Sequence, residues 1–309
     1  MRSTLGHHCC GAMATVLLML AISPLSSAQI PNADCSYLIA GRTFAQLFDG
    51  YFNSGLLENG GGVLPNAGGG VLTFHPHGRL TGKLTLTVGQ LFEAQDVPLL
   101  SDSNYSLEWD TTKHPILCTG TATTDDIMSG PHKFQLVVSS DGTRVEMFHT
   151  DFGLALGVSL NLMPPGRCNN RSLQSTYSYN AKGWMVPPPP PDFPAQSATQ
   201  LLNDFMPFAF SGAIKFDPNR PAPSEPPDAP PGSAYLEGWD TVSLNGVIVP
   251  RTYTGWYLVN ADCTSTQAFV DGQGHSTHVE AFVTKEGTLQ IVNVDPVEAG
   301  LVLAFTAKR

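Results

Sequence analysis

The second half of the chain contains stretches in which apolar and polar residues alternate with a period of two, such as that from Thr277 to Val283. Such alternation, in segments rich in Val, Ile, Thr, Phe and Tyr and bounded by turn residues, predicts β-strands with one buried face. No helix is expected in this half. The eight predicted strands are Leu173–Asn180, Phe208–Phe216, Ala234–Leu244, Val247–Val259, Ser265–Val270, Thr277–Thr284, Leu289–Val294 and Leu301–Ala307.

The first half carries the same kind of pattern, with a Gly-rich stretch from Gly55 to Gly70 that we expect to be a connection. Eight short strands with hairpin-length turns in each half predict an all-β protein of two tandem antiparallel eight-stranded barrels of the calycin-like kind. We favour barrels over the alternative, sandwiches, because closure removes exposed edge strands. The predicted strands of this half are Tyr37–Leu47, Val71–His75, Arg79–Val88, Tyr105–Asp110, Thr119–Thr124, Lys133–Ser139, Arg144–His149 and Leu154–Leu162.

The two halves also repeat one another. Cys118-Thr119 and Cys263-Thr264 begin stretches that end at Gly142-Thr143 and Gly287-Thr288, with the same offset of 145 residues at both ends. An internal repeat of this kind predicts two similar domains, at 29–165 and 166–309. We expect the boundary near Pro164-Pro165-Gly166.

The first 28 residues predict a secretory signal peptide. Arg2 precedes an apolar run from Met13 to Ile22, which is too short to span a bilayer, and Ser26-Ser27-Ala28 supplies small residues for cleavage after Ala28. We therefore expect a secreted protein, extracellular or periplasmic.

Four cysteines follow the predicted signal, and secretion permits them to form disulfides. Four cysteines allow three pairings. Cys35 and Cys168 open the two copies, while Cys118 and Cys263 lie at matched places inside them, so the repeat predicts Cys35–Cys118 and Cys168–Cys263. The chain has no Cys/His cluster with zinc spacing, and we predict no metal site.

The composition is acidic, with 26 Asp and Glu against 16 Lys and Arg and a net charge of −10. This balance argues against nucleic acid and anionic membranes as partners. No later segment is long and apolar enough to span a membrane. The oligomeric state and the host do not follow from the sequence.

Proline-rich segments occur only in the second copy, at Pro187–Pro191 and between Pro218 and Gly232. Such segments cannot join a sheet ladder, and we expect extended or mobile surface loops. A recognition loop for a polyproline-binding partner is the alternative.

A series of short motifs links the second copy to a known group of proteins. Leu173 to Tyr177 is followed by Phe-Asp-Pro-Asn at Phe216–Asn219, by the run from Asn245 to Gly255, and by Asn-Ala-Asp-Cys-Thr at Asn260–Thr264. This order resembles small secreted bacterial β-proteins of unknown function. The eight-strand pattern is also similar to that of lipocalins and other calycins, by analogy of architecture alone.

Signature motifs of catalysis and cofactor binding are missing: no Gly-x-Ser-x-Gly, His-Glu-x-x-His, Walker or dinucleotide fingerprint is present, and we expect no cofactor. His75 and His77 could share a metal with His114, His132 or His149, but Pro76 and Gly78 favour a hairpin turn. His275 and His278 would face opposite sides of a strand.

His149 and Asp151 are the weak catalytic candidates. They are spaced for one face of a strand, with Glu146 near, and a His-Asp pair can act as a general base with its orienting group. The sequence names no nucleophile, and a polar cluster at a strand end is the alternative. Whether the protein is an enzyme stays open.

Aromatic residues are the better indication of binding. Tyr105 and Trp109 in the first copy and Tyr253 and Tyr257 in the second lie on strands that we take as equivalent, and Gly255 could leave space between two rings. We predict these four as ligand-binding residues in barrel interiors that hold a small apolar or sugar-like molecule. Core packing of the four rings, a barrel-type cyclase or isomerase, and an envelope or matrix interaction protein are the alternatives.

Overall fold

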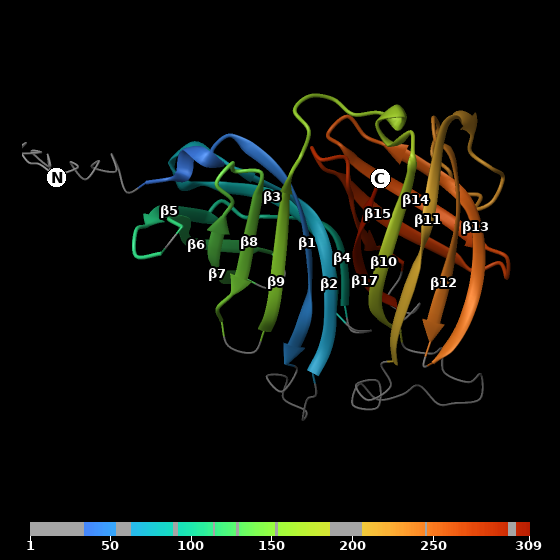
Figure 1. Cartoon of the computed structure of the whole chain (residues 1–309), viewed down its shortest axis with the longest axis horizontal. Helices are drawn as coiled ribbons and strands as arrows, with labels where there is room; N and C mark the ends of the chain where they lie inside the picture. The colour runs from blue at the N-terminus through green and yellow to red at the C-terminus, as the bar shows by residue number, and fades with distance from the viewer. Residues whose placement is uncertain are drawn as a thin grey trace, which may run out of the picture. The chain divides into compact units, whose positions relative to one another are not determined.

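The computed structural model describes residues 34–53, 63–88, 92–113, 115–127, 130–151, 154–185, 206–244, 246–295 and 301–309. Residues Asp34–Arg309 form one compact unit, which contains two antiparallel β-sheets (Figure 1). The predicted all-β class is therefore confirmed. Among the described residues no helix is long and apolar enough to cross a membrane.

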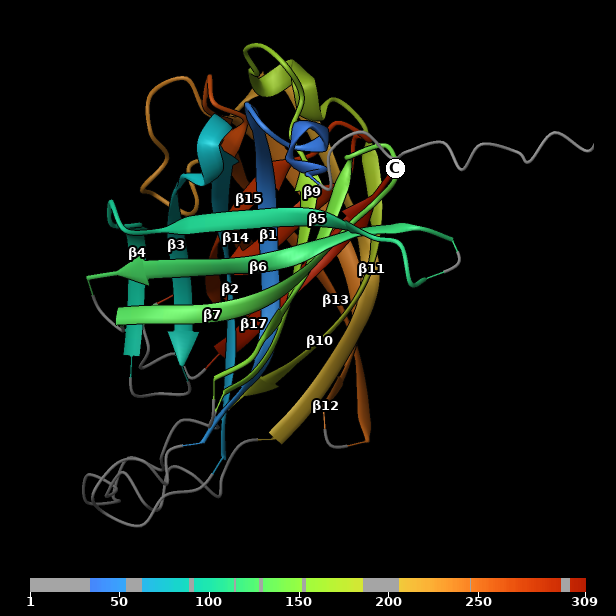
Figure 2. The same cartoon turned by 90° about the vertical axis from the view of Figure 1, so that its left-hand side faces the viewer.

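The first sheet has nine strands in the order β4-β3-β2-β1-β9-β8-β7-β6-β5 and remains open between β4 and β5. It curls strongly, so that β5, β6 and β7 run crosswise to β1, β2 and β3 (Figure 2). Its strands are β1 (Arg42–Asn53), β2 (Val63–Phe74), β3 (Leu80–Val88), β4 (Phe92–Pro98), β5 (Asn104–Asp110), β6 (Leu117–Asp126), β7 (Gly130–Val138), β8 (Arg144–His149) and β9 (Leu154–Leu162).

The second sheet is a closed eight-stranded barrel, as predicted, in which each strand pairs with its neighbours in the sequence and the last pairs with the first. Its strands are β10 (Thr176–Met185), β11 (Met206–Pro221), β12 (Ala234–Leu244), β13 (Val247–Val259), β14 (Thr264–Asp271), β15 (Ser276–Val283), β16 (Leu289–Asn293) and β17 (Leu301–Lys308).

The first domain differs from the predicted eight-stranded barrel in two places. The Gly-rich stretch that we expected to be a connection contributes β2, in which Gly70 lies so close to β3 that an added methyl group would collide with the Lys83 carbonyl oxygen. A strand that the sequence pattern did not predict, β4, pairs with β3. Among the strands of the described residues β4 pairs with β3 alone, so the sheet stays open there.

Both predicted disulfides are confirmed, at Cys35–Cys118 and Cys168–Cys263. In each domain the first cysteine lies just before a short 3-10 helix, η1 (Ser36–Leu38) or η4 (Asn170–Leu173). The second cysteine lies at the start of β6 in the first domain and immediately before β14 in the barrel. The two domains are therefore tied at equivalent points.

The two cores are built on the same aromatic arrangement. In the first domain the Phe44 and Tyr105 rings both meet Phe74 edge to face, with centroids 5.5 and 5.0 Å from it. In the barrel the matching rings are Tyr177, Phe216 and Tyr257, at 5.5 and 4.9 Å. We call these sets the aromatic triads. All six rings are buried, and each triad joins the first, second and a later strand of its sheet.

The outer face of the barrel at β15–β17 packs on the first sheet. Ala45 of β1 belongs to the barrel's hydrophobic cluster. Thr85 donates a hydrogen bond of 2.8 Å to Glu280, and the Gln290 amide donates to the Ser159 carbonyl oxygen at 3.3 Å. Burial raises the pKa of Glu280 above its usual value. This contact explains why every residue of β16 is buried, on both faces.

Three predictions fall outside the described residues: the signal peptide at 1–28, the first Pro-rich segment at 187–191, and His114.

Candidate binding site inside the barrel

Four polar side chains meet inside the barrel. The Arg251 guanidinium binds the Asp240 carboxylate through two hydrogen bonds of 3.0 and 2.9 Å. The Tyr179 hydroxyl donates to the same carboxylate at 3.2 Å and lies 2.8 Å from the Tyr253 hydroxyl. Either hydroxyl can donate in this contact, and the Tyr253 hydroxyl also lies 3.4 Å from the Ala213 carbonyl oxygen. We call these four residues the barrel network.

The strand pattern explains why the network points inward. Asp240 lies on the same face of β12 as the buried Leu236, and Arg251 on the same face of β13 as Tyr253 and Tyr257. Asp240 and Arg251 are directly opposite in the β12–β13 register. Gly238 leaves room for the Tyr253 ring, with which an added methyl group would collide.

Burial dominates the electrostatics of the network. The Asp240 side chain is 3% exposed and that of Arg251 36%. Burial raises the pKa of Tyr179 far above its usual range, and the neighbouring Tyr253 and Asp240 raise it further. Burial likewise raises the pKa of Tyr253, so both phenols remain neutral hydrogen-bonding groups. Burial opposes the charge on Arg251, but Asp240 more than offsets this and the pKa of Arg251 is raised.

An aromatic wall adjoins the network. The Tyr179 ring contacts Phe210 and Phe305 at centroid distances of 5.5 and 5.3 Å, and Phe208 stacks on Phe210 at 5.7 Å. Sequence reasoning named Tyr253 but missed its three partners. The available signal was Asp240, a charged residue on the apolar face of a predicted strand.

Two further polar groups lie on the inward faces of the strands. Gln267 is opposite Tyr257 in the β13–β14 register, and Asn293 is opposite Val279. Within the described part of the chain, the side-chain oxygens Oε1 of Gln267 and Oδ1 of Asn293 are buried without a hydrogen-bond partner. Buried acceptors of this kind are uncommon in protein interiors.

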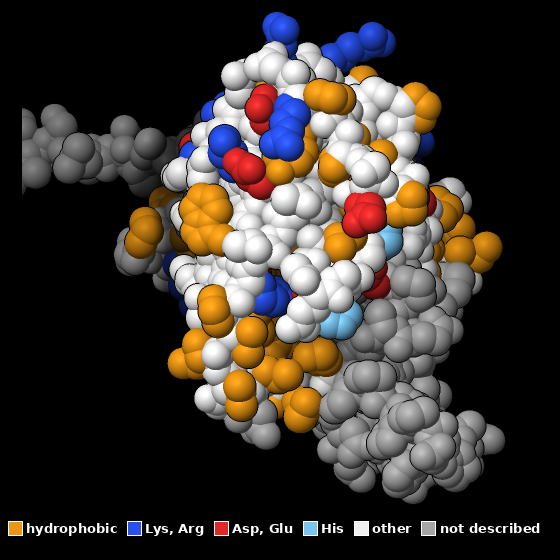
Figure 3. All heavy atoms as spheres, turned by 90° about the vertical axis from the view of Figure 1, so that its right-hand side faces the viewer, with side chains coloured by type: hydrophobic (Ala, Val, Ile, Leu, Met, Phe, Trp, Pro, Cys, Tyr) orange, Lys and Arg blue, Asp and Glu red, His pale blue; other side chains and the backbone are white. Residues whose placement is uncertain are grey.

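One end of the barrel carries exposed apolar residues. The β12–β13 hairpin extends past Phe208, which pairs with Leu244, and its Val247 and Ile248 are 63% and 68% exposed. Figure 3 shows hydrophobic side chains gathered at the lower end of this side of the molecule. Val242 and Leu244 of the same hairpin pack against the hydrophobic cluster of the barrel.

The four predicted ligand-binding residues separate into different roles. Tyr105 and Tyr257 belong to the aromatic triads, and each hydroxyl donates to a backbone carbonyl, of His75 at 2.9 Å and of Asn170 at 3.1 Å. Trp109 is half-buried beside Cys118. Of the four, Tyr253 alone takes part in the barrel network.

Gly255 does not leave a space between two rings. A methyl group added there would collide with the Ala268 carbonyl oxygen, because β14 approaches closely at this point.

The paired histidines lie where strand geometry predicts. His75 lies just before a short turn, η3 (Pro76–Gly78), and His77 lies within it, and the His75 ring bonds Thr81 at 2.7 Å. His275 pairs with Asp271, whereas His278 pairs with Asp295. His275 and His278 therefore contact different carboxylates.

His149 and Asp151 are brought together, with Nε2 and Oδ2 3.5 Å apart, but Glu146 is not part of the group. Glu146 accepts from Arg144 and Ser159 on the opposite face of β8. The Nδ1 atom of His149 is buried, and Nε2 faces both Asp151 and His132. The Nε2 atom thus has both a carboxylate and a second imidazole beside it.

The second Pro-rich segment is tied to the barrel rather than projecting as an extended loop. Asp228 accepts from the Trp256 indole at 3.1 Å and contacts the His278 ring at 2.8 Å. The Asn170 amide donates to the Gly232 carbonyl oxygen at 2.9 Å. Trp256 is buried, so the segment covers an apolar part of the barrel wall.

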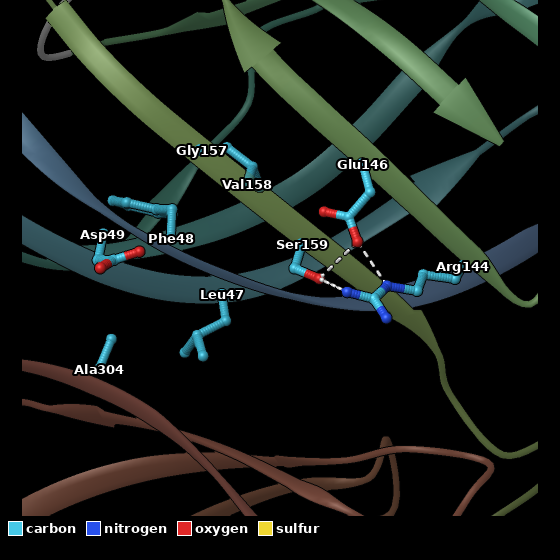
Figure 4. A pocket seen from close by; sticks show the side chains of 9 residues that line it. All are labelled: Leu47, Phe48, Asp49, Arg144, Glu146, Gly157, Val158, Ser159 and Ala304. Carbon is cyan, nitrogen blue, oxygen red and sulfur yellow. Dashed lines mark hydrogen bonds and ion pairs between the residues drawn. The ribbon is translucent and has the colours of Figure 1, made fainter. Parts of the chain in front are cut away.

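A surface pocket of about 270 Å³ lies over β1, β8 and β9 (Figure 4). The Arg144–Glu146 ion pair and Ser159 form one side of it, and Leu47 and Ala304 face them. Arg144 is neutralised by Glu146, and the pocket has no buried charged group among its lining residues. It is therefore a weaker candidate than the barrel interior.

Comparison with protein-family models, with curated proteins and with solved structures gives no match.

Proposed function

We propose that the barrel of the second domain binds a small molecule with an apolar body and one polar end. The barrel network carries this proposal. A charged pair and two phenols inside an apolar core add little stability, because the desolvation of the charges offsets their attraction. Buried groups whose pKa values are shifted in this way cluster at functional sites.

The surroundings of the network indicate the chemistry of the ligand. Phe208, Phe210 and Phe305 offer aromatic faces to an apolar body, while Tyr179 and Arg251 can hydrogen-bond a polar end. The exposed apolar residues at the hairpin end, Val247–Val249, offer an apolar surface along which the ligand can approach the barrel interior. The interior of an eight-stranded barrel is either filled by side chains or holds one small ligand, and lipocalins use theirs for a ligand, so the architecture supports the proposal by analogy.

Two disulfides are typical of proteins from an oxidising compartment. We infer that the protein is secreted and meets its ligand outside the cytoplasm.

A fluorescent aromatic anion, 8-anilinonaphthalene-1-sulfonate, tests the site. We expect saturable binding to the full chain, weakened about tenfold by Phe210→Ala or Tyr179→Phe, because a lost aromatic face or hydrogen bond costs about 1–2 kcal/mol. Trp239→Ala, on the exposed outer face of β12, is the matched control. Equal affinity in all variants, with native mass spectra of the secreted protein showing no retained molecule, would contradict the proposal.

A further inference from the structure

Two imidazoles and a carboxylate converge in the first domain. His132 lies on β7, His149 ends β8, and Asp151 follows two residues later. His149 Nε2 is 3.1 Å from His132 Nδ1 and 3.5 Å from Asp151 Oδ2. The three donor atoms all lie within 4.8 Å of one another.

The strands hold these groups in place. Phe134 is opposite His149 in the β7–β8 register, and its ring meets the imidazole edge to face at 5.1 Å. The Lys133 backbone N–H donates to Asp151 Oδ2 at 2.8 Å. The His149 side chain is 1% exposed and that of Asp151 37%, so the group is open to solvent on the carboxylate side.

The Asp151 carboxylate accepts a backbone hydrogen bond at a turn that both domains share. In the barrel the His278 backbone N–H donates to Asp295 at 2.8 Å, as that of Lys133 does to Asp151. The next backbone bond also repeats: Thr150 donates to Lys133 and Val294 to His278, both at 2.9 Å. An aspartate at this turn therefore needs no functional explanation.

The second copy lacks imidazoles at the two matched positions, although its His278 ring contacts Asp295 from the position of Lys133. With Lys133 matched to His278, Thr277 stands at the position of His132. The pairing of Phe134 with His149 corresponds to that of Val279 with Asn293. The first domain therefore has two nitrogen ligands beside a shared carboxylate, and the barrel has none at those two places.

We propose that His132, His149 and Asp151 bind one divalent transition-metal ion of the zinc type. Ligand bonds of about 2.0–2.1 Å in a tetrahedral site place donor atoms about 3.4 Å apart, close to the two short separations here. His149 Nε2 carries either one proton or one lone pair, so hydrogen bonding suits only one of its two contacts, whereas a cation stabilises all three donors. Three protein ligands leave the fourth position to water or a substrate oxygen.

Titration of the full, disulfide-bonded chain with Co²⁺ and then Zn²⁺ tests the site, with visible absorption and calorimetry as the readouts. We expect one ion per chain, a tetrahedral Co²⁺ spectrum, and displacement by Zn²⁺. His132→Gln and His149→Gln should each lower affinity roughly 100-fold or more, since even changes outside the ligand set cost 10–100-fold. The double variant His75→Gln/His77→Gln should bind as the wild type does.

The repeat supplies a matched pair of variants. Asp151→Asn and Asp295→Asn make the same change at the equivalent turn of the two domains: each keeps an oxygen that accepts the backbone N–H but loses the negative charge. Only Asp151→Asn should weaken metal binding. Equal affinity in these two variants, no binding to the wild type, or binding that survives His132→Gln would overturn the proposal. Circular dichroism checks that each variant folds. Should His149→Gln fail to fold, the His132→Gln titration decides.

Discussion

The two domains differ most at the place of one strand. In the barrel β13 has 13 residues and pairs with both β12 and β14. In the first domain the same place is divided between β4 and β5, of 7 residues each. In the part of the chain that the structure describes, β4 pairs only with β3 and β5 only with β6, and the gap is crossed by single bridges such as Leu99–Asp126.

This difference separates the shared framework from the candidate sites. The disulfides, the aromatic triads and the aspartate turns occur in both domains. Tyr253 and Arg251 of the barrel network lie on β13, the strand without a continuous counterpart. His132 and His149 occur only in the open domain. Each domain thus carries its distinctive chemistry where it departs from the repeat.

The disulfides should make the largest contribution to the free energy of unfolding, and nearly the same contribution in each domain. Replacing Cys35 and Cys118 by Ser, or Cys168 and Cys263 by Ser, should lower the free energy of unfolding by about 4–5 kcal/mol in either domain. The reason is that the bridges close loops of similar length, with sequence separations of 83 and 95. Urea denaturation measures the loss. A loss below about 1 kcal/mol in one domain alone would break the equivalence.

The aromatic triads should make the next largest contribution to stability, and a similar one in the two domains. Tyr105→Ala and Tyr257→Ala should each cost about 3–5 kcal/mol, because each removes a buried ring from a packed core. The Phe variants, which lose only the hydroxyl, should cost about 1 kcal/mol. Tyr37→Ala, at an exposed ring, is the control. A Tyr257→Ala protein of wild-type stability would contradict the packing role and favour the original binding interpretation of that ring.

Substitutions in the barrel network should destabilise the second domain only. Arg251→Leu should cost about 3 kcal/mol, because it leaves the Asp240 carboxylate buried without its cation. The double variant Asp240→Leu/Arg251→Leu should recover most of this loss while weakening ligand binding. Thermal unfolding and the fluorescent-probe titration separate the two effects. A double variant as unstable as the single one would show that the pair serves packing alone.

The contact between His278 and Asp228 should give the smallest effect, below about 1 kcal/mol, because the side chains are 33% and 49% exposed. Burial opposes the charge on His278, but hydrogen bonds to Asp295 and Asp228 outweigh it and raise its pKa. The contribution of His278 to stability is therefore fully present below its unfolded pKa of about 6.5 and is lost as the pH rises through the raised pKa.

The pKa of Asp228 is shifted the other way. Burial opposes its charge, but the His278 and Trp256 hydrogen bonds outweigh this and lower the pKa. Its contribution is lost only as pH falls below its unfolded pKa of about 4. Hydrogen exchange should therefore show the Pro-rich segment around Asp228 most protected between about pH 4 and 6.5 and less so at higher pH. His278→Gln should abolish this dependence, and equal protection at pH 5.5 and 8.5 in the wild type would contradict the prediction.

Local pattern was sufficient for most strands. Ala234–Leu244, Val247–Val259 and Leu154–Leu162 have the predicted bounds, because alternation sets the buried face and turn residues end the run. It failed at β2, where Gly68–Gly70 resemble a loop. Glycine pairs there because neighbouring chains approach closely, which is a property of the folded sheet.

The sequence by itself determined the all-β class, the repeat, both disulfide pairings and one member of the barrel network, Tyr253. Only the tertiary structure decided that one sheet closes and the other stays open. It also brought Tyr179 to Asp240 across 61 residues and His132 to His149 across 17. The physical reason is that periodicity records which face of a strand is buried, whereas strand register and sheet curvature determine which buried side chains meet.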